Sequence, residues 1–148
     1  MPAALRREIL ERYCLAHRSR AETHIAEAVD RGGRVIHIAS HSFTPVLDGQ
    51  VRDAEIGLLY DPARPLELEF CRRWQASLKA PAPELKIRRN YPYAGKSDGF
   101  TAHLRPRFEG NVYLGIELEI NQRHVAKGGW HWRDFKSRVV DSLLGSQT

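Results

Sequence analysis

The stretch RVIHIASHSFTP, residues 34–45, sets the fold that we expect for this chain. Its first half is apolar and rich in β-branched residues, which is typical of a strand buried inside a sheet. Alternation along a strand over 35–40 places the odd-numbered side chains, His37 among them, on one face. The second half contains Ser, Phe, Thr and Pro, which predicts a loop that begins at His41.

Helices and strands are expected on both sides of this strand. A long helix over about 3–30 comes before it, and Gly32-Gly33 ends that helix. A helix over 65–79 has an apolar side chain at every fourth position from Leu66, and Pro65 suits its first turn. Further strands are predicted over 55–61, 84–90 and 112–121, and a last helix over 130–144.

This order of elements predicts a single α/β domain over residues 1–148. We expect three layers, α/β/α, around a mixed and mostly parallel sheet. In such sheets, ligands bind where the strands end. His41, the NYPY segment at residues 90–93 and EIN at residues 119–121 come at predicted strand ends, which indicates one shared site.

Composition excludes several classes of protein. The 148 residues are 42% apolar and 28% charged, and no apolar run is long enough to span a bilayer. Cys14 and Cys71 form no CxxC pattern, so we expect a reducing cytoplasm. The net charge of +5 is spread along the chain, so a nucleic-acid partner is not the favoured interpretation.

Three kinds of side chain and one segment of the sequence could carry chemistry. His41 is either a surface residue or a metal ligand, whereas the mid-strand His37 favours packing or hydrogen bonding. Glu117 and Glu119 share one face of their strand, and the residues alone do not decide which of them acts as a base. Arg52, Arg88 and Arg89 could each bind a carboxylate or phosphate. NYPYAGKSDG, residues 90–99, is either a binding loop or a structural turn.

Three segments in the same order resemble the N-formylglutamate amidohydrolase family: HSFTPVLDGQVRDAEIGLLYDP, RRNYPYAGKSDGFT and YLGIELEINQ. The resemblance covers residues 34–124 and extends to the preceding helix. It implies a partial phosphorylase/hydrolase-like fold, related to zinc-dependent exopeptidases, and hydrolysis of the amide or formamide bond of a small N-acyl amino acid such as N-formylglutamate. A zinc ion would activate water against the carbonyl group.

The resemblance also implies roles for individual residues. His41 matches a zinc ligand, and Glu119 matches the general base. Arg52, Asn90, Tyr93 and Gly95 match residues that line the substrate pocket, with Arg52 as the partner of the substrate carboxylate.

Family members carry a further region before the first helix, which would supply the remaining zinc ligands and cover a sheet edge. We therefore expect this chain alone to be a weak or inactive hydrolase, and a partner or second copy to cover the exposed edge. The alternative is a non-catalytic binding or interaction module that keeps the pocket without the metal. A third interpretation, a basic nucleic-acid binder, would require salt-dependent binding to any duplex.

Overall fold

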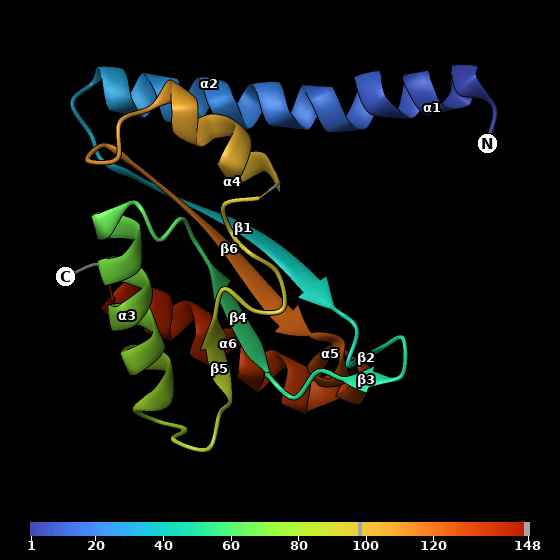
Figure 1. The fold of residues 1–148 in the computed structure, drawn as a ribbon, viewed down its shortest axis with the longest axis vertical. Helices are drawn as coiled ribbons and strands as arrows, with labels where there is room; N and C mark the ends of the chain where they lie inside the picture. Colours follow the sequence, from blue (N-terminus) through green and yellow to red (C-terminus); the bar gives the residue numbers. More distant parts are fainter. Residues whose placement is uncertain (98, 147–148) are drawn as a thin grey trace.

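The computed structural model describes residues 1–97 and 99–146 and has three layers (Figure 1). The strands of the central sheet lie in the order β1-β6-β4-β5. β1 pairs with β6 in parallel and β4 with β5 in parallel, whereas β4 runs antiparallel to β6. The predicted α/β class, with a mixed and mostly parallel sheet between helices, is confirmed. The strand bounds are Val35–Phe43 (β1), Ile56–Leu59 (β4), Ile87–Arg89 (β5) and Tyr113–Asn121 (β6).

Helices α3 (Pro65–Lys79) and α6 (Gly129–Gly145) cover one face of the sheet (Figure 1). Trp74 of α3 is fully buried there against apolar side chains of β4, β6 and α6. Its indole Nε1 donates a hydrogen bond to Ser142 Oγ at 3.0 Å, so the one polar atom of this ring is satisfied. The larger hydrophobic core of the protein lies on this face.

The other face is covered by α2 (Ala16–Asp30) and α4 (Gly99–Leu104). The predicted helix over 3–30 is present, and α1 (Ala3–Ile9) and the π-helical η1 (Leu10–Leu15) form its first half. Neither α1 nor η1 has a buried residue, and this half extends away from the sheet (Figure 1). No helix among the described residues is long and apolar enough to cross a membrane.

The elements differ from expectation in three places. β1 continues through His41 to Phe43 because its pairing with β6 extends to Asn121, so the loop predicted to begin at His41 is wrong. β2 (Val46–Leu47) and β3 (Gln50–Val51) form a hairpin inside that expected loop. The other elements absent from the prediction are α4, the 3₁₀-helix η2 (Arg105–Arg107) and α5 (Gln122–Lys127).

A buried ion pair joins the helical layers to the sheet. Glu67 of α3 is 0% exposed and Arg105 of η2 is 5% exposed, and Arg105 Nε lies 3.1 Å from Glu67 Oε1. Glu67 also accepts hydrogen bonds from the backbone N–H groups of Asp61 and Gly115. Arg105 donates to the carbonyl oxygens of Gly95 and Gly115. Because both charges are paired and hydrogen-bonded, their burial is tolerated.

Replacing Arg105 by Met should therefore be strongly destabilising, because Glu67 keeps a buried charge without its partner. We expect a loss of about 3–5 kcal/mol in the free energy of unfolding, measured by urea denaturation. The control is Arg73→Met, which breaks an exposed ion pair with Glu69 at 3.4 Å on α3, the helix that carries Glu67. It should cost less than about 1 kcal/mol. Equal losses in the two variants would contradict the importance of the buried pair.

A second prediction concerns His124, a residue of α5 that is 4% exposed and stacks on Phe135. Burial lowers the pKa of His124 below 6.5; His131, Arg123 and Lys127 add to this, whereas Glu55 opposes it. Because the unfolded chain then binds the proton more readily, stability should be fully present above pH 6.5 and fall as the pH drops below it. His124→Gln should reduce this slope in urea unfolding between about pH 5 and 8. A matched His24→Gln variant, at an exposed histidine of α2, controls for the loss of a histidine as such; an unchanged slope in His124→Gln would refute the assignment.

Candidate active site

The register of the sheet brings several predicted site residues onto one face. His41 of β1 lies opposite Glu119 of β6, and Glu119 lies opposite Gly57 of β4 on its other side. Gly57 in turn lies opposite Arg88 of β5. Since paired residues on neighbouring strands point to the same face, these four positions form a row across the sheet. His41 lies inside β1 and not, as the sequence predicted, beyond the end of the strand. Its side chain is exposed.

Glu119 has the environment of a reactive carboxylate. Its side chain is 5% exposed, and its buried Oε2 has no hydrogen-bond partner among the described residues. Burial raises the pKa of Glu119 and neighbouring Glu117 adds to this, whereas His41 and Arg52 oppose it. A buried carboxylate oxygen without a partner is costly, so its presence indicates a functional site.

Glu117 differs from Glu119 although both lie on the same face of β6. Its Oε1 accepts a hydrogen bond from the buried Thr101 Oγ1 at 2.7 Å, and Gly99 of α4 approaches the same oxygen closely. This carboxylate therefore serves to anchor α4 to the sheet. The two glutamates, which the sequence did not distinguish, therefore differ in their contacts: Glu117 has a side-chain partner, and Glu119 Oε2 has none among the described residues.

Arg52 follows the β2–β3 hairpin and is fixed at its backbone and its side chain. Its N–H donates to Pro45 O at 2.8 Å, and its Nη1 donates to the Tyr93 hydroxyl at 3.0 Å. The Arg52 guanidinium carbon also lies 5.2 Å from the centroid of the Tyr93 ring, a cation–π distance. Two residues predicted to line one pocket, 41 positions apart in the sequence, are thus in contact.

The segment after β5 crosses the sheet face with little space beneath it. Asn90 Oδ1 accepts hydrogen bonds from Tyr60 N at 3.0 Å and from Gly95 N at 3.3 Å. Any side chain at Gly95 would collide with the backbone of residues 59–60, and one at Gly57 would collide with Tyr91 O. Asn90 and Gly95 therefore hold the loop in place; their predicted contact with substrate stays a prediction. Asp98, in the same predicted segment, lies outside the described residues.

An open cleft of about 730 Å³ lies between β1 and the N-terminal helix. His41 forms part of its wall, together with His37, Tyr13 and Phe100. His37 Nδ1 is 2.8 Å from the Tyr113 hydroxyl and its ring packs edge-on against Phe100, so this histidine is hydrogen-bonded and packed as predicted. The cleft gives solvent and small molecules access to the His41 side of the row.

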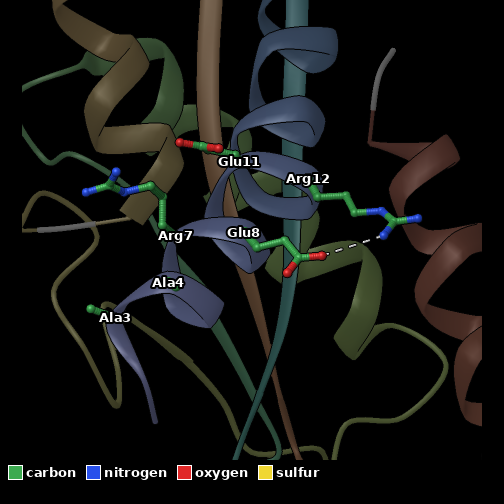
Figure 2. A pocket seen from close by; sticks show the side chains of 6 residues that line it. All are labelled: Ala3, Ala4, Arg7, Glu8, Glu11 and Arg12. Carbon is green, nitrogen blue, oxygen red and sulfur yellow. Dashed lines mark ion pairs between the residues drawn. The ribbon is translucent and has the colours of Figure 1, made fainter.

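A second hollow, drawn in Figure 2, offers no comparable chemistry. Helices α1 and η1 supply all of its lining residues, and its Glu8–Arg12 ion pair, at 3.9 Å, is exposed. Exposed pairs on a single helix contribute little and create no enclosed site. The lining residues are Ala3, Ala4, Arg7, Glu8, Glu11 and Arg12.

The predicted zinc site requires several metal-binding side chains that meet at one point. Within residues 1–97 and 99–146, no three His, Cys, Asp or Glu side chains converge on one point. A catalytic zinc takes three protein ligands and one open position. His41 is therefore a single candidate ligand, and the described residues do not fit a complete zinc site.

Three residues of the site were not predicted from the sequence: Gly57, Thr101 and Asn121. A glycine inside an apolar strand is a signal of close backbone approach, and this signal was available for Gly57. Asn121 ends the predicted strand over 112–121 and no helix was predicted to follow it, so the sequence did not indicate its role as the N-cap of α5. Thr101 carries no such signal, because its partner Glu117 is recognised only in the folded chain.

Comparisons with known proteins are consistent with this geometry. The sequence model of a family described as N-formylglutamate amidohydrolase matches residues 1–126. Among solved structures, the chain is similar to the crystal structure of gene product Atu2144 from Agrobacterium tumefaciens, with a TM-score of 0.69 and 26% identity. That match covers 100% of this chain and 57% of the other chain. A search of curated proteins finds no match.

The environment of Glu119 leads to a testable prediction about stability. A carboxyl group whose folded pKa is raised above 4.5 stabilises the fold in its protonated form, and that contribution is lost as the pH rises. Glu119→Gln should therefore be more stable than the wild type at pH 7, as measured by urea unfolding. The difference in the free energy of unfolding between the two proteins should narrow toward pH 4.5.

The control for this comparison is Glu69→Gln, at an exposed carboxylate of α3. Because Glu69 is not buried and its charge is not among those that act on Glu119, the same chemical change should bring no gain in stability. A Glu119→Gln variant less stable than the wild type at neutral pH would contradict the interpretation of Glu119 as a strained carboxylate.

Proposed function

Because the chain belongs to the N-formylglutamate amidohydrolase family, we propose that its Glu119 face takes part in hydrolysing the amide or formamide bond of a small N-acyl amino acid such as N-formylglutamate. The observation that carries this proposal is the buried Glu119 Oε2, which has no partner within residues 1–97 and 99–146. Glu119 lies in a row with His41 and close enough to Arg52 for the arginine charge to act on the carboxylate. The chain spans 57% of its solved relative, so the activity of the whole protein is part of the proposal.

Glu119 would act as the general base. Its Oε2, which has no hydrogen-bond partner among the described residues, would accept a proton from a water molecule that attacks the substrate carbonyl and would return that proton to the departing nitrogen. A raised pKa suits this exchange, because a base works best when its pKa lies nearer to the operating pH. Burial also removes competing water from the carboxylate.

Arg52 would bind the substrate carboxylate. Its guanidinium presents parallel N–H donors that match the two oxygens of a carboxylate. Tyr93 limits the positions of this guanidinium through one hydrogen bond and one ring contact. Asn90 and Gly95 support Tyr93 by holding its loop against β4.

The proposal for zinc is limited to one candidate ligand, His41. This exposed histidine is the candidate ligand, and the described residues do not complete its coordination, so no step is derived through the metal. The same observation favours a second candidate function, a non-catalytic module that binds the N-acyl amino acid through Arg52 without hydrolysing it. The predicted partner at the sheet edge would meet β1, which lies at one end of the strand order.

The purified chain should be assayed for formate release from N-formyl-L-glutamate. With Glu119 as the general base, Glu119→Gln should lower the rate by about 10²–10⁴-fold, whereas binding of the substrate is retained. Glu69→Gln, at an exposed carboxylate of α3, is the matched control and should keep the wild-type rate.

The outcomes separate the two candidate functions. Saturable binding of N-formyl-L-glutamate without formate release would favour the binding module. Formate release that persists in Glu119→Gln would overturn the assignment of the base. A chain that neither binds nor hydrolyses the compound would overturn both candidates.

A further inference from the structure

Four consecutive carbonyl oxygens in the segment 52–55 accept hydrogen bonds from the end of β6 and the start of α5. Asn121 Nδ2 donates to the first and third, on Arg52 and Ala54, at 3.1 and 2.9 Å. Arg123 Nη2 donates to the second at 2.7 Å, and the backbone N–H of Asn121 donates to the fourth at 2.9 Å. This segment, which begins with Arg52, is therefore tied to the strand that carries Glu119.

The Asn121 side chain has no freedom to rotate. It is 0% exposed, and its Oδ1 accepts a hydrogen bond from Arg123 N at 3.1 Å, which caps the N-terminus of α5. Its amide nitrogen uses both donors on the two carbonyl oxygens described above. A buried amide with every polar atom satisfied fixes the distance between the elements that it joins.

Arg52 makes its other contacts away from β6. Its N–H bonds to Pro45 O and its guanidinium to Tyr93, in the hairpin base and the loop after β5. Of the hydrogen bonds that the described residues make with Arg52, the one from Asn121 Nδ2 to its carbonyl oxygen leads directly to β6. Asn121 also lies two residues after Glu119, on the same face of the strand.

We propose that Asn121 is a positioning residue: it holds Arg52 at a set distance from Glu119, so that a substrate carboxylate bound by Arg52 presents its acyl group to the base. The inference rests on the proposed function, in which Arg52 binds the carboxylate. It adds a residue that acts through Arg52 and makes no contact with the substrate itself.

The experiment compares glutarate with glutaramide, in which carboxamides replace both carboxylates. Neither compound carries an N-acyl group, so dissociation constants can be measured by NMR titration whether or not the chain is active. Charge-assisted hydrogen bonds should give the wild type about a 10- to 100-fold preference for glutarate. Asn121→Ser keeps an oxygen that can cap α5 but cannot reach both carbonyl groups, and it should reduce this preference about tenfold.

The preference separates positioning from a merely structural role. A variant that only loses stability binds both compounds less well by the same factor, and its preference stays at the wild-type value. Ser142→Ala is the matched control, because it removes a buried hydrogen bond from Trp74 on the opposite face of the sheet. Its preference should equal that of the wild type.

Asn121→Thr provides the second test if Asn121→Ser does not fold. It stays uncharged and keeps an oxygen that can cap α5, and it loses the amide donors to Arg52 and Ala54. It should likewise lose most of the preference for glutarate. Tryptophan fluorescence and thermal unfolding establish that each variant is folded before the titration.

The outcomes distinguish two claims: that Arg52 binds the carboxylate, and that Asn121 positions Arg52. A wild type with no preference for glutarate, or a preference that survives Arg52→Ala, overturns Arg52 as the carboxylate anchor and this inference with it. A wild-type preference that depends on Arg52 but persists unchanged in folded Asn121 variants overturns the positioning role alone. A loss in both Asn121 variants, with Ser142→Ala unaffected, supports it.

Discussion

The buried ion pair between Glu67 and Arg105 determines how the parts of this fold are joined. A charge in the interior is tolerated only when it is paired and its remaining donors or acceptors are used. Here the pair collects backbone groups from the start of β6, the turn before α3 and the loop after β5. Arg64 adds hydrogen bonds to the carbonyl oxygens of Tyr113 and Phe108 beside it. Apolar packing alone would leave these backbone groups without partners.

The candidate site is arranged by the same means. Arg105 holds the carbonyl group of Gly95, which anchors the loop that carries Tyr93. At the other side of Glu119, Asn121 holds the segment that carries Arg52. Glu119 therefore lies between two loops, each fixed by a buried polar side chain. A hydrogen bond between Arg52 and Tyr93 then joins the two loops over the site, so a change in either anchor alters the position of Arg52.

Local signals in the sequence predicted the longer helices, the strands of the main sheet and the shared face of Glu117 and Glu119, but not the connections of the site. The helix Pro65–Lys79 is correct because its apolar side chains repeat at helical spacing. His41 was placed in a loop because Ser, Thr and Pro follow it, yet pairing with β6 keeps the strand extended to Phe43. Glu67 and Arg105 lie 38 positions apart, so no local pattern reveals that they form a pair. The role predictions for His41, Glu119 and the pocket residues stay predictions.

Glu117 and Glu119 illustrate why position along a strand is insufficient to assign chemistry. Alternation gives both carboxylates the same face, and only the tertiary contacts differ. Glu117 has the Thr101 hydroxyl, and Glu119 has an oxygen with no partner in the described part of the chain. The first contributes to holding α4 on the sheet, whereas the raised pKa of Glu119 predicts a cost in stability at neutral pH. Such a cost would be explained by what Glu119 can do to a bound molecule. If Arg52 and Glu119 are held at a set spacing by Asn121, the site would select compounds by the distance between a carboxylate and an acyl carbonyl, with side-chain identity a secondary factor.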